Sequence, residues 1–177
     1  MKSLRELYRI GRGPSSSHTM GPEAAARRFL AAYPDAERFR VTLYGSLAST
    51  GRGHLTDRAV EDVFGAGRTE VIFDTETQDL PPPNTMDLAA FSGGREIGRA
   101  RVLSVGGGAI RVEGHPEEDT PEVYPERSFA EIADYCKHRR LRLWEYVEQR
   151  EGPEIWDFLF EVWSAMKSAI LNGLTAS

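Results

Sequence analysis

The chain has 177 residues, of which 40% are hydrophobic and 28% are charged, and its formal net charge at pH 7 is −5. This length and balance allow one sizeable domain with a substantial core, and the acidic charge argues against a dedicated nucleic-acid binder. The N-terminus predicts no secretory signal, and no apolar stretch approaches the ~20 residues that span a bilayer, so a cytoplasmic protein is expected. A single cysteine, Cys136, excludes an internal disulfide and cannot hold an iron–sulfur cluster, which normally requires several thiolates.

The first half of the chain predicts helices and strands joined by polar loops. A helix should begin at Pro22, because proline is favoured at the first helical position, and end near Tyr33, because Pro34 disfavours helix in the residue before it. Polar and β-prone apolar residues alternate over 38–44, which is the pattern of a half-buried strand. The elements expected here are a helical turn at 4–10, a helix at 22–33, strands at 38–44 and 70–74, a loop at 45–54, a helix at 56–64 capped by Thr56, and an irregular proline-rich segment at 80–86.

The second half predicts hairpins followed by helices. Alternating residues flank Gly106-Gly107-Gly108, and either a wide hairpin or a bulge that admits a ligand or a neighbouring backbone would explain these glycines. Ser128 and Glu131 have the spacing of a capping box at a helix start. The elements expected here are a hairpin at 88–98 that turns at 92–94, strands at 99–105 and 109–113, an exposed acidic loop at 114–127, and helices at 129–138, 143–147 and 153–171.

The final predicted helix is more apolar than a lone surface helix needs to be. Ile155, Leu159, Val162, Met166 and Ile170 recur at spacings of three and four residues, and three aromatic side chains widen this apolar face. We therefore expect the helix to connect to a further part of the protein. The whole pattern predicts an α+β fold, in which helices cover a mixed or antiparallel sheet.

A run of hydroxyl side chains with one histidine precedes the first long helix, between Gly11 and Pro22. A helix N-terminus offers unpaired N–H groups and the positive end of the helix dipole, which suit a carboxylate or a phosphate. His18 can move a proton near neutral pH, so the run predicts an anion site with a proton carrier beside it. A Ser/Thr-rich turn with a surface histidine is an equal alternative. The adjacency of Ser17 and His18 does not establish a serine hydrolase relay.

Two further loops contain candidate functional residues. His54 follows two glycines that permit close approach of a ligand, and Asp57 is near enough in sequence to fix its tautomer. Asn84 and Thr85 follow three prolines and offer groups that can hydrogen-bond a ligand. For both segments an ordinary connecting loop is the alternative.

The segment 13–22, with the sequence GPSSSHTMGP, resembles the signature loop of the iron–sulfur-dependent L-serine dehydratases. Segments 44–57, 83–86 and 104–108 resemble further segments of that family in the same order, so the resemblance spans nearly the whole chain. That family is built from a β domain and a larger α domain, on one chain or on two subunits, and this chain resembles the β domain. The resemblance implies a fold similar to the allosteric substrate-binding domain of some phosphoglycerate dehydrogenases.

The resemblance also implies a division of labour. It places the β domain at 1–152 and a linker helix at 153–177, which leads toward an α domain that binds a 4Fe–4S cluster. No metal ligand is assigned to the present chain. The implied reaction is the conversion of L-serine to pyruvate and ammonia through loss of water. The residues implied in it are His18 and His54 as catalytic residues, and Ser15, Ser16, Ser17, Thr19, Asn84 and Thr85 as substrate-binding residues.

The implied partners are the α domain and the substrate L-serine, with no nucleic acid and no membrane, and a homodimer is left open. The isolated chain is expected to be inactive. A different class of function remains as the alternative, namely a non-catalytic regulatory module that binds serine or another small carboxylate.

Overall fold

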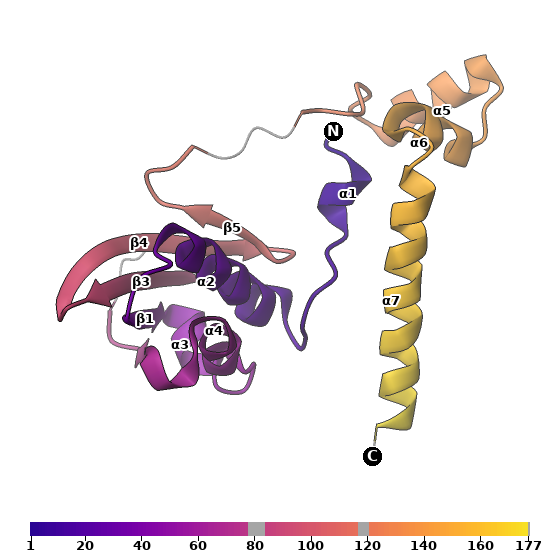
Figure 1. Cartoon of the computed structure of the whole chain (residues 1–177). Helices are drawn as coiled ribbons and strands as arrows, with labels where there is room; N and C mark the ends of the chain where they lie inside the picture. Colours follow the sequence, from indigo (N-terminus) through magenta and orange to yellow (C-terminus); the bar gives the residue numbers. More distant parts are fainter. Residues whose placement is uncertain (78–83, 117–120, 177) are drawn as a thin grey trace. The chain divides into compact units, whose positions relative to one another are not determined.

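The computed structural model describes residues 1–77, 84–116 and 121–176 (Figure 1). The chain divides into two compact units, one of residues 11–117 and one of residues 1–10 with 118–177. Among the helices in the described parts of the chain, none combines the length and hydropathy that a membrane crossing requires.

The unit 11–117 is built on a mixed sheet with the strand order β2-β1-β3-β4-β5. Its elements are η1 (Ser16–Met20), α2 (Gly21–Ala32), β1 (Arg38–Tyr44), α3 (Gly45–Thr50), α4 (Thr56–Phe64), η2 (Ala66–Arg68), β2 (Thr69–Asp74), β3 (Thr85–Ser92), β4 (Arg95–Gly106) and β5 (Ala109–Val112). β1 and β2 are parallel, with α3 and α4 in the connection between them, and all other neighbouring strands are antiparallel (Figure 1). The predicted α+β class with a mixed sheet is confirmed, whereas the likeness to a phosphoglycerate dehydrogenase domain stays a prediction.

The core of this unit lies between the sheet and its helices. Alternate residues of β1 (Phe39, Val41 and Leu43) are at most 2% exposed, because successive side chains of a strand point to opposite faces of a sheet. They share one apolar cluster with Phe29 of α2 and Phe64 of α4. The rings of Phe39 and Phe64 are stacked, with centroids 4.1 Å apart and an angle of 12° between their planes. This packing holds the C-terminal parts of α2 and α4 against the sheet, and the N-terminal ends of the same helices adjoin the candidate site.

Several predicted elements are confirmed, and others differ from expectation. The second arm of the hairpin at 88–98 and the strand at 99–105 form one continuous strand, β4. β1 has the expected bounds, and α2 begins and ends one residue before the predicted helix. The prediction of a loop at 45–54 was wrong over its first part, because residues 45–50 form α3. Leu47 and Ala48 of this helix are buried. The irregular segment expected at 80–86 was wrong at its end, because β3 begins at Thr85; residues 80–83 lie outside the described residues.

The triple glycine combines the two alternatives that the sequence left open. The pairing of β4 with β5 shifts register between Ser104 and Gly106, which is a bulge, and the chain then turns into β5. Gly106, Gly107 and Gly108 all have positive φ angles, of 103°, 59° and 77°. Glycine adopts this region without the steric cost that a Cβ would add, so the residue type follows from the turn.

The second unit contains α1 (Leu4–Leu7), α5 (Phe129–Arg139), α6 (Leu143–Glu151) and α7 (Ile155–Thr175). Glu151 joins its N-terminal and C-terminal segments, since it accepts hydrogen bonds from the Ser3 hydroxyl at 2.6 Å, the Leu4 amide at 2.7 Å and the Tyr124 hydroxyl at 2.6 Å. Ser128 caps α5 as predicted, by accepting a bond from the Glu131 amide. This unit includes α5 and α6 as well as α7, and the family-based boundary at 152/153 stays a prediction.

Candidate functional site

The two histidine-bearing loops predicted from the sequence meet in the structure. The ring centroids of His18, in η1, and His54, in the turn between α3 and α4, are 4.7 Å apart, with an angle of 35° between the rings. Both side chains are half-buried. Residues 36 positions apart thus form one pair that is in contact and still reaches the surface.

The first loop is held by capping at the start of a continuous helical segment. The Ser15 hydroxyl accepts a hydrogen bond from the His18 amide at 3.1 Å, and the Ser15 carbonyl accepts bonds from the amides of Thr19 and Met20 at 3.0 and 3.2 Å. A serine at an N-cap satisfies helix donors that would otherwise have no partner. The turn continues into α2 at Gly21, followed by Pro22 in the first turn. Local sequence therefore fixes the backbone that carries His18.

Two buried threonines join the histidine loops to each other. The Thr19 hydroxyl donates to the backbone carbonyl of His54 at 2.8 Å, and the Thr56 hydroxyl donates to the backbone carbonyl of His18 at 2.6 Å. Both threonines are 0% exposed. We call this reciprocal pair of hydrogen bonds the threonine brace. It satisfies two part-buried carbonyls and fixes the separation of the two histidine backbones.

The backbone of α3 determines the tautomer of His54. Its Nδ1 lies 3.0 Å from the Thr50 carbonyl oxygen. A carbonyl can only accept a hydrogen bond, so Nδ1 carries the proton. In a neutral ring, Nε2 is then unprotonated and can accept a proton. The next residue, Leu55, has a φ of 56°, a left-handed conformation that a leucine seldom adopts.

His18 contacts a second residue of α3. Its Nε2 lies 2.9 Å from the Ser46 hydroxyl, and its Nδ1 lies 3.5 Å from the Ser15 hydroxyl. Burial lowers the pKa of His18 below its ordinary value of 6.5, the neighbouring His54 lowers the pKa further, and the interaction with Ser46 acts in the opposite direction. His18 is therefore predominantly neutral at pH 7.

The first turn of η1 also has donors that face no protein partner. Within the described residues, the amides of Ser16 and Ser17 form no hydrogen bond, as expected at the start of a helical segment. Ser16 is exposed and Ser17 is half-buried. These amides lie one and two residues before His18, so an anion bound there would lie close to the histidine pair.

The segment 104–108 approaches the first loop through Ser104. A Cβ at Gly21 would lie 2.1 Å from the Ser104 hydroxyl, so only glycine permits this contact between α2 and β4. The Ser104 hydroxyl is buried and has no hydrogen-bond partner among the described residues. The backbone carbonyl of Asn84 accepts a hydrogen bond from the Ser104 amide at 3.0 Å, and the side-chain Nδ2 of Asn84 donates to the Ser104 carbonyl at 3.5 Å. Asn84 is thus connected to the histidine loop indirectly.

Not every residue predicted for the site has a side chain that can reach a ligand. Thr19 is buried and uses its hydroxyl in the threonine brace, and Thr85 is only 3% exposed within β3. Asp57 does not orient His54, because the Thr50 carbonyl does; the Asp57 carboxylate accepts a bond from the Arg58 amide. Thr56 does not cap α4, since its hydroxyl is bonded to His18.

Ser46 and Thr50 were missed as residues that orient the histidines. Both lie in α3, where the sequence predicts a loop. Without a helix at that place, their spacing from His54 could not be interpreted as a helical spacing. Four residues separate Thr50 from His54, the spacing at which a histidine side chain can reach back to a carbonyl in a helical turn. That spacing was the available signal. In the described parts of the chain no three His, Cys, Asp or Glu side chains gather as a metal site.

Comparisons with known proteins agree with the motif resemblance. Residues 3–66 match the family model described as serine dehydratase beta chain. L-serine dehydratase 1 of Escherichia coli (strain K12) is 30% identical over an alignment that covers 98% of this chain and 49% of that protein. The L-serine dehydratase of Streptomyces coelicolor is 30% identical, with 98% and 50% coverage, and that of Mycobacterium bovis is 34% identical, with 84% and 42% coverage.

These matches and the motifs support a serine dehydratase β domain, and the match to the family model itself covers residues 3–66. The chain spans about half the length of the curated relatives that it matches.

The threonine brace predicts a specific loss of stability. Thr56→Val keeps the shape of this fully buried side chain and removes the donor to the part-buried His18 carbonyl, which should cost about 1–3 kcal/mol of the free energy of unfolding. Urea denaturation measures this loss. Thr50→Val is the matched control, because the Thr50 hydroxyl donates to the Ser46 carbonyl on the exposed face of α3. Equal losses in the two variants would contradict a special role for the brace.

The lowered pKa of His18 predicts a pH effect with a defined sign. A histidine whose pKa is lower in the folded chain than in the unfolded chain is protonated more readily when the chain unfolds. The contribution of neutral His18 to the free energy of unfolding is therefore present above pH 6.5 and is lost as the pH falls below that value. NMR titration should show a His18 pKa below 6.5, and His54→Gln should raise that pKa. Between about pH 7.5 and pH 5.5, His18→Gln should lose less stability than the unmodified chain. An unchanged His18 pKa in His54→Gln would contradict the electrostatic effect of His54 on His18.

Proposed function

We propose that this chain contributes substrate-binding and proton-transfer residues to an L-serine dehydratase, whose active site an α domain completes. The observation that carries the proposal is the contact of His18 with His54, which joins the two family motifs in one surface site. The relatives named above are L-serine dehydratases, and this chain corresponds to about half of the length of each. We therefore expect the chain to be inactive by itself and to act in the cytoplasm.

His54 is the residue that we propose as proton acceptor. Loss of water from L-serine requires removal of the weakly acidic α-proton, so a positioned base is needed. The hydrogen bond from Nδ1 to the Thr50 carbonyl leaves the lone pair of Nε2 available and fixes the plane of the ring. The same hydrogen bond stabilises the ring after it has gained a proton at Nε2, since Nδ1 stays a donor.

His18 supports this step from the other side of the pair. Its lowered pKa keeps it neutral near pH 7, so it does not add a positive charge that would oppose protonation of His54. Ser46 fixes its ring through Nε2. We propose that His18 orients the substrate, with Ser46 as a positioning residue.

The carboxylate of the substrate is proposed to bind at the first turn of η1. The amides of Ser16 and Ser17 are donors without a protein partner in the described structure, and the helix dipole favours an anion there. The Ser17 hydroxyl adjoins the same turn. Thr19 and Thr85 are left out of this set because they are buried, and Asn84 stays a proposed contact through its half-buried amide side chain.

The iron–sulfur cluster of the family does not fit the residues of this chain. Cys136 is the single cysteine, and no group of three metal-ligating side chains is present among the described residues. We therefore assign the cluster, and the acid that departure of the hydroxide requires, to the α domain. The helix at 153–177 is proposed to lead toward that domain.

The assignment of His54 is tested in the protein that includes the α domain. His54→Gln removes a base of the required strength while keeping a polar side chain of similar size, so kcat for pyruvate formation should fall by about 100-fold or more. The iron–sulfur absorbance must be unchanged, which shows that the other half of the site is intact. His138→Gln, on the exposed face of α5, is the matched control and should keep normal activity. Near-normal turnover of His54→Gln would remove His54 from the mechanism.

A further inference from the structure

A cavity of about 180 Å³ lies between α2 and the strands β4 and β5, and the proposed site does not explain it. β5 is an edge strand of the sheet, and α2 lies along the face of β4 and β5 (Figure 1). The described residues that line the cavity all belong to the unit 11–117, and they include neither His18 nor His54. We call this space the α2–β5 cavity.

Small side chains on both walls create the cavity. Ala25, Phe29 and Ala32 of α2 line it at the spacing of one helix face, and Ala100 of β4 lies on the opposite wall. Protein interiors are normally packed without voids of this size. A contact between helix and sheet that keeps alanine on both sides therefore leaves space for another molecule, and the cavity opens to solvent at the exposed Ala32.

The floor of the α2–β5 cavity is apolar. Val102 is buried there, whereas Ile110 and Val112 are half-buried at the edge of the apolar cluster. Tyr33 closes one end, because its ring lies so close to the backbone of Gly98 that a Cβ at that position would overlap it. An apolar cavity of roughly 150 Å³ is large enough to hold a benzene ring. The α2–β5 cavity therefore admits one apolar group of up to that size with a short polar extension.

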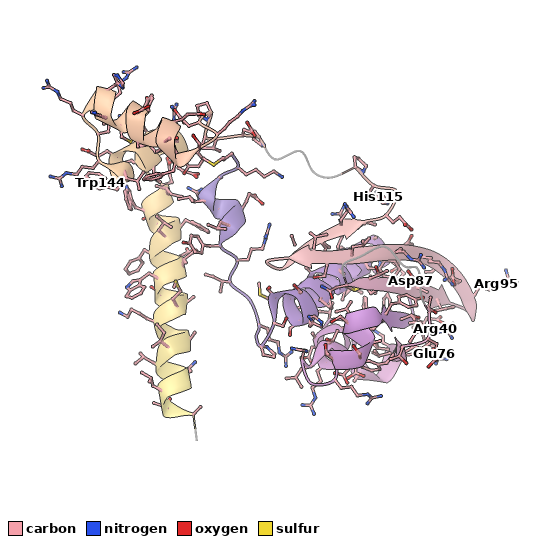
Figure 2. The ribbon with its side chains drawn as sticks, turned by 180° about the vertical axis from the view of Figure 1, so that it is seen from behind. Arg40, Glu76, Asp87, Arg95, His115 and Trp144 are labelled. Carbon is pink, nitrogen blue, oxygen red and sulfur yellow. The ribbon has the colours of Figure 1, made fainter. Side chains whose placement is uncertain are left out.

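The mouth of the cavity is basic. Arg28 of α2 and His115 line it and are exposed, and Figure 2 shows His115 on the segment that follows β5. None of the described residues that line the cavity is acidic. Arg99 also borders the cavity, but its guanidinium donates to the Glu96 carboxylate at 2.7 and 2.9 Å. A guanidinium group binds carboxylates through charge-assisted hydrogen bonds, and a histidine adds a further donor, so the mouth favours an anionic headgroup.

We propose that the α2–β5 cavity binds a small carboxylate that carries one apolar group, either a single aromatic ring or a branched aliphatic chain. The apolar group fills the space between the alanines, and the carboxylate lies at the mouth beside Arg28 and His115. L-Serine does not meet these requirements, because its hydroxymethyl group would give up hydrogen bonds to water against an apolar floor. The proposal does not rest on the proposed enzymatic function, and its failure would leave the histidine assignments untouched.

NMR titration of the chain with phenylacetate tests the ligand class. Phenylacetate combines one ring with a carboxylate, so it should bind with a Kd of about 1 mM or lower and shift the methyl signals of Ala100, Ile110 and Val112. Phenylacetamide, the neutral analogue, should bind about 10-fold more weakly, and L-serine should leave these signals unchanged. Equal affinity for phenylacetate and phenylacetamide, or a shift of these methyl signals by L-serine, would contradict the proposed class. The absence of saturable shifts with phenylacetate, or shifts confined to the histidine loops, would overturn the site.

Two variants test the position of the ligand. Ala100→Leu fills the cavity and should abolish the phenylacetate shifts, and thermal unfolding checks that this variant is folded. Arg28→Gln, at the exposed mouth, should weaken phenylacetate binding about 10-fold and leave phenylacetamide binding unchanged. Arg27→Gln is the matched control and should bind phenylacetate normally, because Arg27 lies outside the lining and pairs with Glu23 at 2.6 Å. Undiminished binding in folded Ala100→Leu, or equal losses in Arg27→Gln and Arg28→Gln, would overturn the proposal.

Discussion

The threonine brace is the interaction on which the site depends. Two loops that are far apart in sequence each present a part-buried backbone carbonyl, and each carbonyl accepts a hydrogen bond from a fully buried threonine of the other loop. Because unpaired buried polar groups are costly, neither loop can move away without losing a hydrogen bond. The half-buried contact between His18 and His54 is a consequence of this backbone arrangement. That contact, together with burial, keeps His18 neutral.

Much of the fold follows from patterns that operate over a few residues. The alternation in β1 and the proline at the start of α2 located both elements nearly to the residue. The helix α3 was missed because Gly45-Ser46 and Ser49-Thr50 have the composition of a loop. What makes this segment helical is long-range burial of Leu47 and Ala48, which a local pattern does not contain. The parallel pairing of β1 with β2 is likewise a tertiary property.

The site divides in a similar way. Sequence motifs selected His18 and His54, and their resemblance to a known family indicated that they act together. The resemblance did not distinguish exposed from buried hydroxyl groups within one motif. Thr19 was therefore grouped with Ser16, although only Ser16 is exposed. The motifs also did not show that the Thr50 carbonyl orients His54, because the four-residue spacing indicates this contact only once residues 45–50 are known to be helical. The tautomer of that ring is a property of backbone geometry alone.

The two hydrogen bonds of the brace end on main-chain oxygens, although the residues that carry these oxygens are the histidines proposed to act in the reaction. A substitution at position 18 or 54 changes the side chain and leaves its carbonyl in place. Architecture and chemistry are therefore encoded in separate atoms of the same residues. A family member could lose its histidines through mutation and still fold around the same two loops, so that loss of activity would leave an intact scaffold on which a different binding function can evolve.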